Sequence, residues 1–152
     1  MPSFRTRHRV RHSADDMFTL VADVEKYPQF VPLCERLYVR RRDEGEDGTT
    51  TLVADMTVAY SFFRETFTSR VTLDPANRRI FVEYVNGPFR HMENRWEFRP
   101  TGEEGRCEVD FYISWEMKSR TLSAMVGSVF ERAFRRFARA FEARADAVYG
   151  AA

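Results

Sequence analysis

Hydrophobic positions near the end of the chain, from Ser119 to Tyr149, recur at the spacing of one face of an α-helix. The face comprises Leu122, Met125, Val126, Val129, Ala133, Phe137, Ala140 and Phe141, and it is widened by Phe130, Phe134, Ala145 and Val148. At about 1.5 Å per residue this helix is roughly 45 Å long. Such a broad apolar face requires a broad hydrophobic partner, which the preceding residues should supply.

Apolar and polar residues alternate in the segments before this helix, which is the pattern of strands with one buried and one wet face. Strands are expected over residues 3–12, from 37 onward, and over 52–60, 66–73, 80–85, 92–99 and 107–117. Ser13 followed by Asp16 predicts the start of a short helix after the first strand, and one or two further turns around Tyr27. We expect one α+β domain spanning residues 1–152.

Composition places the chain among ordinary intracellular proteins. Its 152 residues suit a single domain, and Cys34 and Cys107 show neither CxxC nor Cys/His clustering, so we expect two reduced buried thiols and no metal site. Residues 1–11 carry arginines rather than the apolar core of a secretory signal, and no run reaches the ~20 apolar residues of a membrane span. A cytoplasmic location is expected; the oligomeric state is left open.

The charge distribution is more informative than the net charge of +1. Arg5, Arg7, Arg9 and Arg11 share one face of the first predicted strand, and further arginines lie along the predicted final helix. The ordinary interpretation of the arginine row is a solvated outer face. The functional interpretation is a surface for an anionic partner, either lipid headgroups or RNA phosphates.

No local motif for catalysis is present: the sequence lacks a GxSxG elbow, a glycine-rich phosphate loop and metal-ligand spacing. No catalytic residue is therefore predicted. A polar cluster assembled by the fold from His8, Glu65 and Asn94 is the one arrangement that leaves a cyclase-like or dehydratase-like enzyme open.

Aromatic residues are plentiful, with 14 Phe, six Tyr and two Trp. At inward strand positions they form either an ordinary core or the lining of a cavity. Gly127, inside the final helix, costs about 1 kcal/mol relative to Ala, which close packing or room for a ligand would explain. The segment from Tyr60 to Arg64 joins two strands without usual turn residues. Tyr60, Phe62 and Phe63 are therefore expected either at an exposed hairpin tip, as a lid over a cavity or a membrane-touching edge, or as core residues at a bulge.

Several segments together resemble a known family. They are His12 to Phe18, Leu20 to Phe30, Val31 to Cys34, Tyr60 to Val71, Gly87 to Phe89 and Trp96 to Phe98. With the order of elements, they resemble the START-like, helix-grip superfamily that includes polyketide cyclases. Within it the chain is similar to the coenzyme Q-binding family, which also contains a bacterial ribosome-association toxin.

This resemblance implies a curved antiparallel sheet of about seven strands around a long C-terminal helix, with two short helices after the first strand. It implies a hydrophobic tunnel that binds ubiquinone or a similar polyprenyl lipid in support of respiration, with no cofactor required. The predicted lining is Phe62, Phe67, Trp96, Phe98, Phe111, Trp115, Met125, Val129 and Phe130. Transient contact with the inner face of the membrane is one expected partnership, and the ribosome is the alternative.

Overall fold

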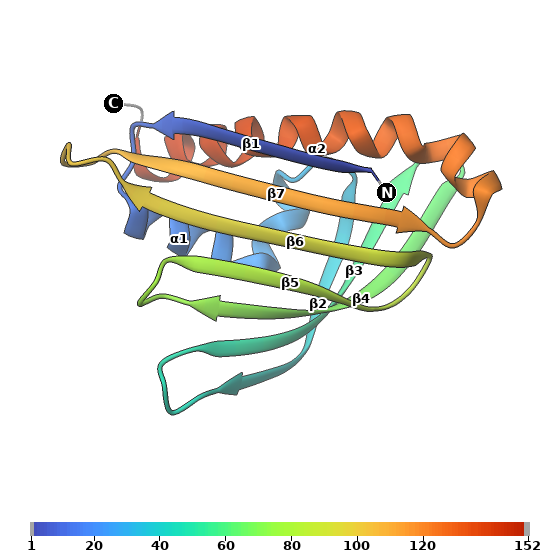
Figure 1. Cartoon of the computed structure of the whole chain (residues 1–152), viewed down its shortest axis with the longest axis horizontal. Coiled ribbons are helices and arrows are strands. Elements are labelled where there is room, and N and C mark those ends of the chain that lie inside the picture. Colours follow the sequence, from blue (N-terminus) through green and yellow to red (C-terminus); the bar gives the residue numbers. More distant parts are fainter. Residues whose placement is uncertain (1, 151–152) are drawn as a thin grey trace.

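The computed structural model describes residues 2–150, so residues 1, 151 and 152 of the predicted 1–152 domain lie outside the described residues. One sheet and one long helix dominate it (Figure 1). The strands are β1 (Ser3–Val10), β2 (Cys34–Glu44), β3 (Thr50–Tyr60), β4 (Phe63–Asp74), β5 (Arg79–Asn86), β6 (Phe89–Pro100) and β7 (Cys107–Met117). The helices are α1 (Ala14–Ala22), the 3₁₀ helix η1 (Val24–Gln29) and α2 (Arg120–Tyr149).

All neighbouring strands are antiparallel, in the order β1-β7-β6-β5-β4-β3-β2. The predicted seven-stranded sheet, the two short helices after the first strand and the long final helix are confirmed. Two bounds differ. The first strand ends at Val10 rather than at residue 12, and the second begins at Cys34, three residues earlier than expected.

Side-chain caps start both α-helices. The hydroxyl of Ser13 accepts a hydrogen bond from the backbone N–H of Asp16 at 3.1 Å, as its position predicted. The hydroxyl of Ser119 accepts one from the N–H of Leu122 at 3.2 Å. Each bond satisfies a backbone donor that has no partner within the helix, so both helix starts are fixed by local sequence.

The core lies between the sheet and α2. Trp96 packs on Phe111 and Phe141, with ring centroids 4.6 and 4.9 Å apart, so strands β6 and β7 and the helix meet in one aromatic cluster. The helix residues buried in it follow a strict helical repeat: Val126, Phe130, Ala133, Phe134, Ala138, Phe141 and Ala145. The sheet is therefore the broad hydrophobic partner that the apolar face of the helix required.

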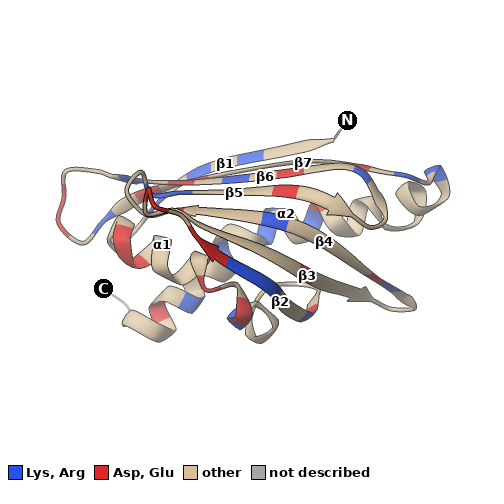
Figure 2. Cartoon of the chain, turned by 90° about the horizontal axis from the view of Figure 1, so that it is seen from below, with Lys and Arg blue, Asp and Glu red and all other residues tan. Residues whose placement is uncertain are grey.

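The meander places its connections at two ends of the molecule. The β3–β4 and β5–β6 turns and the start of α2 lie at one end, which we call the hairpin end (Figure 1). The β2–β3, β4–β5 and β6–β7 turns lie at the other, which we call the acidic end because carboxylates crowd it (Figure 2). The two ends therefore differ in charge as well as in topology.

Gly87, in the β5–β6 turn, shows why a glycine is needed at the hairpin end. Its φ of 147° is one that side chains rarely adopt, and a Cβ added there would lie 2.5 Å from the Cβ of Phe67. The turn thus packs directly on a β4 side chain that proves important below.

Candidate functional site

A cavity of about 110 Å³ lies between the concave face of the sheet and α2. Residues of η1 and the η1–β2 connection, of strands β2 to β7 and of α2 line it, and all but Tyr27, Ser69 and Asn94 are hydrophobic. Ligand sites for small organic molecules usually measure about 300–1,000 Å³. A ligand of ordinary size therefore fits only if the walls move.

Small side chains explain why the cavity exists. Ala54 on β3 and Ser69 on β4 are directly opposite each other across the strand pair, and both are buried and face inward. Ala133 belongs to the lining on the helix side. Where larger residues would interlock, these three leave unfilled space in an otherwise close-packed interior.

The polar groups of the lining are few. The hydroxyl of Tyr27 donates to the backbone carbonyl of Val21, and burial raises the pKa of Tyr27 far above its usual value. The Asn94 side chain donates to the carbonyl of Tyr112 at 2.9 Å and accepts from the indole N–H of Trp96 at 3.0 Å. Asn94 retains one N–H, and Ser69 its hydroxyl, as groups able to donate to a carbonyl oxygen of a ligand.

Four phenylalanines close the cavity toward the hairpin end. Phe67, Phe89 and Phe130 belong to its wall, with ring centroids 5.5 Å apart for Phe67 and Phe89 and 6.1 Å apart for Phe89 and Phe130. Phe63 packs edge to face on Phe130 at 5.7 Å from just beyond the wall. The tip of the β3–β4 hairpin is thus joined to α2 by an aromatic contact.

Of the nine predicted lining residues, Phe67, Trp96 and Phe130 belong to the cavity wall. Phe98, Phe111 and Trp115 do not: they are buried in the core, where Phe98 packs on Phe18 of α1 and Trp115 packs on Phe134 of α2. Strand alternation identified their inward direction correctly. It could not show that helices fill the space above them.

The other three predicted lining residues, Phe62, Met125 and Val129, also lie outside the wall. Phe62 is 83% exposed and Met125 is 47% exposed, because one sits at a hairpin tip and the other lies off the buried helix repeat. Val129 is half-buried beside that repeat. The broad apolar face of the helix concealed which of its residues point to the sheet.

The three residues of the predicted lid differ in exposure. Tyr60 and Phe62 are exposed at the hairpin tip, as the lid interpretation expected, whereas Phe63 is buried, as the core interpretation expected. Tyr60 pairs with Phe63 across a two-residue turn, so there is no bulge. Ser61 adopts a φ of 55°, a left-handed conformation that is costly for a non-glycine residue and that the sequence did not reveal.

Sequence reasoning missed much of the wall, notably the connection from Val31 to Leu33 and the small residues Ala54, Ser69 and Ala133. The sequence did contain an indication of the small residues. Small residues at inward strand positions, opposite each other, indicate either a tight approach or a void. Only the pairing register, which the sequence does not state, brings Ala54 and Ser69 together.

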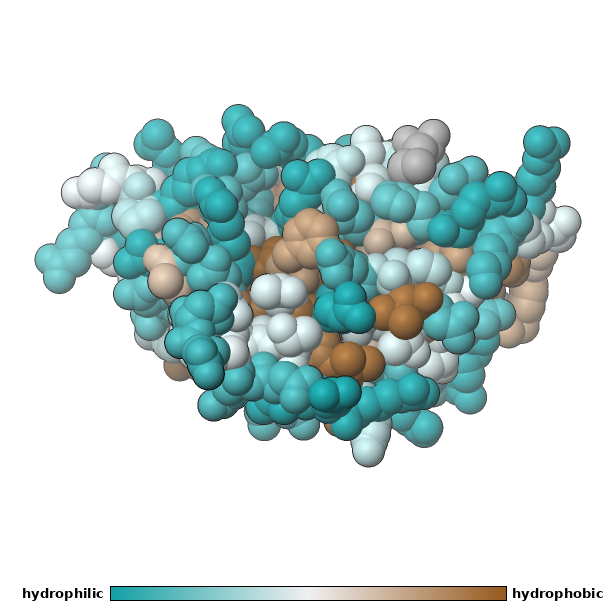
Figure 3. Space-filling model, turned by 60° about the horizontal axis from the view of Figure 1, so that its bottom comes forward, coloured by the Kyte–Doolittle hydropathy of each residue, from teal (hydrophilic) through white to brown (hydrophobic). Residues whose placement is uncertain are grey.

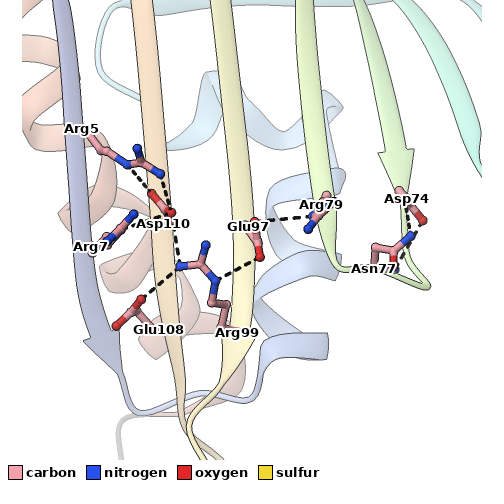
Figure 4. Close-up of polar contacts among 9 residues, drawn as sticks. All are labelled: Arg5, Arg7, Asp74, Asn77, Arg79, Glu97, Arg99, Glu108 and Asp110. Atoms are coloured by element: carbon pink, nitrogen blue, oxygen red, sulfur yellow. Dashed lines mark hydrogen bonds and ion pairs between the residues drawn. The ribbon is translucent and has the colours of Figure 1, made fainter.

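The predicted arginine row on β1 is partly neutralised on the convex face of the sheet (Figure 4). Asp110 of β7, only 5% exposed, accepts hydrogen bonds from Arg5 at 3.0 and 3.2 Å and from Arg7 at 3.4 Å, and Arg99 approaches to 3.3 Å. Burial raises the pKa of Asp110, but the bond and charge of Arg5, with the charges of Arg7 and Arg99, outweigh it and hold the pKa below its usual range. Arg9, farther along β1, and Arg11, just beyond its end, are exposed.

The three residues suggested for an enzyme do not converge. His8 lies 4.0 Å from Glu142, Asn94 is bonded as described, and no hydrogen bond among residues 2–150 joins any two of His8, Glu65 and Asn94. In the same range, no group of three or more His, Cys, Asp or Glu is arranged to hold a metal ion. Cys34 and Cys107 are free and buried, and burial raises the pKa of both to about 11.

The comparisons with known proteins agree with this geometry. Residues 10–142 match the model of the family described as "Polyketide cyclase / dehydrase and lipid transport". The chain belongs to this family. It is 31% identical over 151 residues to the ribosome association toxin RatA of Escherichia coli K12, covering 99% of this chain and 91% of that protein.

Two further proteins are similar to this chain. The mitochondrial coenzyme Q-binding protein COQ10 of Drosophila melanogaster is 33% identical over 136 residues, covering 84% of this chain and 54% of that protein. The 18 kDa protein CC1736 from Caulobacter crescentus, known from a solution structure, is 34% identical in sequence. The two structures superpose with a TM-score of 0.79 over 99% of this chain and 100% of that one. The START-like, helix-grip fold is thereby established for the family member described here.

Proposed function

We propose that this protein binds a hydrophobic lipid without chemically altering it, and that the lipid is a ubiquinone-like polyprenyl quinone. The observation that carries the proposal is the cavity between sheet and α2, whose wall is hydrophobic except for Tyr27, Ser69 and Asn94. Burying a polyprenyl chain there is favourable by about 25 cal/mol per Å² of apolar surface. The relative named as a coenzyme Q-binding protein supports the choice of quinone.

The polar residues suit the head group of such a lipid. A quinone carbonyl accepts hydrogen bonds, and the Ser69 hydroxyl and the remaining Asn94 N–H are the donors that the wall offers. Because the cavity is only about 110 Å³, head group and chain enter by displacing wall residues rather than by filling existing space. The aromatic contacts of Phe130 are the natural place for this displacement.

The test begins with lipid extracted from the purified protein and identified by mass spectrometry, followed by titration of delipidated protein with a short-chain ubiquinone. We expect quinone to be recovered and to bind saturably. Ala133→Leu fills the cavity from the helix side and should abolish binding, whereas Ala143→Leu on the exposed face of the same helix should not. Equal binding by wild type and Ala133→Leu would refute the cavity as the site.

A second candidate function is association with the ribosome. It is favoured by the RatA relative and by three exposed arginines of α2, Arg132, Arg136 and Arg139. They lie along one side of the helix, and within residues 2–150 none of them has a carboxylate partner. Arginines without partners are better suited to RNA phosphates than Arg5 and Arg7, which are engaged by Asp110.

Co-sedimentation with ribosomal subunits at increasing salt tests this candidate. Binding through the helix arginines should weaken steeply with salt and be lost on changing all three to Gln. Changing Arg41, Arg70 and Arg106, which are paired with carboxylates, serves as the control with equal loss of charge. Binding that both triple variants retain would exclude this surface.

A further inference from the structure

The hairpin end of the molecule carries an unusual concentration of exposed apolar side chains. Phe62 is 83% exposed at the very tip of the β3–β4 hairpin, beside Tyr60 at 47%, and Met125 is 47% exposed near the start of α2. An exposed phenylalanine at the tip of a turn has no role in the core. Its hydration is unfavourable unless another apolar phase receives it.

These side chains belong to one region. Phe62 is adjacent in sequence to Phe63, whose ring contacts Phe130, and Met125 lies five residues before Phe130, about 7.5 Å along the helix axis. In both ribbon views the tip of the β3–β4 hairpin and the start of α2 lie at the same end (Figures 1 and 2). On the face shown in Figure 3, by contrast, hydrophilic residues surround the hydrophobic ones.

The tip is also held rigidly. It is a two-residue turn with unbroken strand pairing up to Tyr60 and Phe63, and Ser61 accepts a left-handed φ of 55° to form it. A longer or strain-free connection could fold Phe62 back on the core. The strained turn instead directs it outward, which is a conformation retained at a cost.

Charge favours an anionic partner at this end. Lys118 and Arg120, at the start of α2, are exposed, and within the described residues no carboxylate pairs with either. Of the carboxylates nearby, Glu35 is neutralised by Arg64 at 2.6 Å, and Glu65 and Glu116 are half-buried. The acidic end, in contrast, exposes Asp43, Glu44, Glu46, Asp47, Glu103 and Glu104. In the part of the chain that the structure describes, only Asp43 and Glu103 of these are paired with arginines, Arg41 and Arg106.

We propose that the hairpin end docks on a lipid bilayer that carries anionic headgroups, with Phe62 inserted below the headgroups and Lys118 and Arg120 beside them. An anionic surface attracts this end and repels the acidic end, so the charge distribution sets the orientation. The docked tip is joined to the cavity wall through the Phe63–Phe130 contact. Docking therefore places the aromatic end of the cavity against the membrane. Among residues 2–150 no helix has the length and apolar run needed to cross a bilayer.

Co-sedimentation with quinone-free vesicles tests the proposal, using phosphatidylcholine alone and a 7:3 mixture of phosphatidylcholine and phosphatidylglycerol. The wild type should bind the anionic vesicles and not the neutral ones. Phe62→Ser should lower the partition coefficient about tenfold, because the phenylalanine side chain that inserts into the bilayer is lost. Tyr38→Ser, which removes another exposed aromatic far from the tip, should leave it unchanged. Arg120→Gln should lower it about fivefold and Arg106→Gln, at the acidic end, should not.

Insertion of the hairpin tip into the bilayer is measured by tryptophan fluorescence of the Phe62→Trp variant. Its fluorescence should shift to shorter wavelength on anionic vesicles and be quenched by brominated acyl chains, whereas Trp96 and Trp115 are buried and should not respond. Absence of vesicle binding, binding only to ribosomal particles, or equal loss in the Phe62 and Tyr38 variants would each overturn the proposal. Because the vesicles contain no quinone, this result is independent of whether the cavity binds one.

Discussion

The rings of Phe63 and Phe130 meet edge to face, with centroids 5.7 Å apart, and this pair links the β3–β4 hairpin to the helix that walls the cavity. Phe130 belongs to the wall and Phe63 lies just outside it. A ligand larger than the 110 Å³ available must separate some of the surrounding side chains. We expect that separation of this pair opens the cavity toward the hairpin end.

Phe63→Leu should therefore speed lipid exchange. The substitution keeps an apolar side chain but removes a ring contact worth about 0.5–1.5 kcal/mol, which corresponds to roughly 2- to 10-fold faster release of a bound quinone. Stopped-flow transfer of a fluorescent quinone analogue measures this. Phe4→Leu is the control, because it removes a comparable aromatic contact, with Phe111 at 6.3 Å, on the β1 side. Equal acceleration in both variants would show a general loosening instead of a gate.

Gly127→Ala should stabilise the protein. A Cβ at this position would meet only the Ser123 hydroxyl oxygen, at 3.9 Å, so close packing does not explain the glycine. Alanine is favoured in a helix interior by about 1 kcal/mol, and urea unfolding should report a gain of that size. Gly87→Ala is the opposite control, since its Cβ would collide with Phe67. A loss of stability in Gly127→Ala would contradict this geometry.

Ser61→Gly should relieve strain at the hairpin tip. A left-handed φ costs a non-glycine residue about 1–2 kcal/mol, part of which the greater freedom of glycine in the unfolded chain offsets. We expect a net gain of about 0.5 kcal/mol in the free energy of unfolding. The same substitution at Ser123, inside α2, should instead cost roughly 0.5 kcal/mol. If Ser61→Gly also destabilised the fold, the left-handed turn would be wrong.

Asp110→Asn should destabilise the fold in a pH-dependent manner. The folded-state pKa of Asp110 is lowered, so its contribution is present above the unfolded pKa of about 4 and is lost as pH falls through the folded value. At pH 7 the variant should lose about 1–3 kcal/mol, because three arginines lose a buried charged acceptor. Urea unfolding at pH 7 and pH 3 should show the difference shrink in acid. Glu83→Gln, an exposed partner of Arg70, should change little at either pH.

Periodicity was sufficient to predict the secondary-structure elements and their order, whereas the curved sheet around the helix was implied by the family resemblance. Strand alternation and the helical repeat from Ser119 to Tyr149 correspond to β1 to β7 and α2, and the predicted cap Ser13 lies at the start of α1. These features depend on local sequence, because a side chain's inward or outward direction follows from its place in a strand or helix.

The cavity was less predictable, because it depends on which inward residues meet. Trp115 faces inward as expected, yet Phe134 covers it, whereas Ala54 and Ser69 leave space because the register sets two small residues opposite each other. Ion pairs between residues far apart in the sequence likewise cannot be predicted without the folded structure. Arg5 lies 105 residues before the buried Asp110 that neutralises part of its charge, and no local pattern relates the two.

The pairing of β1 with β7 has a consequence for biosynthesis. Ser3 lies opposite Ser114, and β7 is the only neighbour of β1 in the sheet, so the first strand to emerge during translation waits for one of the last. The helical wall from Phe130 to Phe141 is made later still. Contacts of such long sequence separation fold slowly. The cavity is therefore complete only after Phe141 has been made, and the nascent chain exposes its aromatic strands until then.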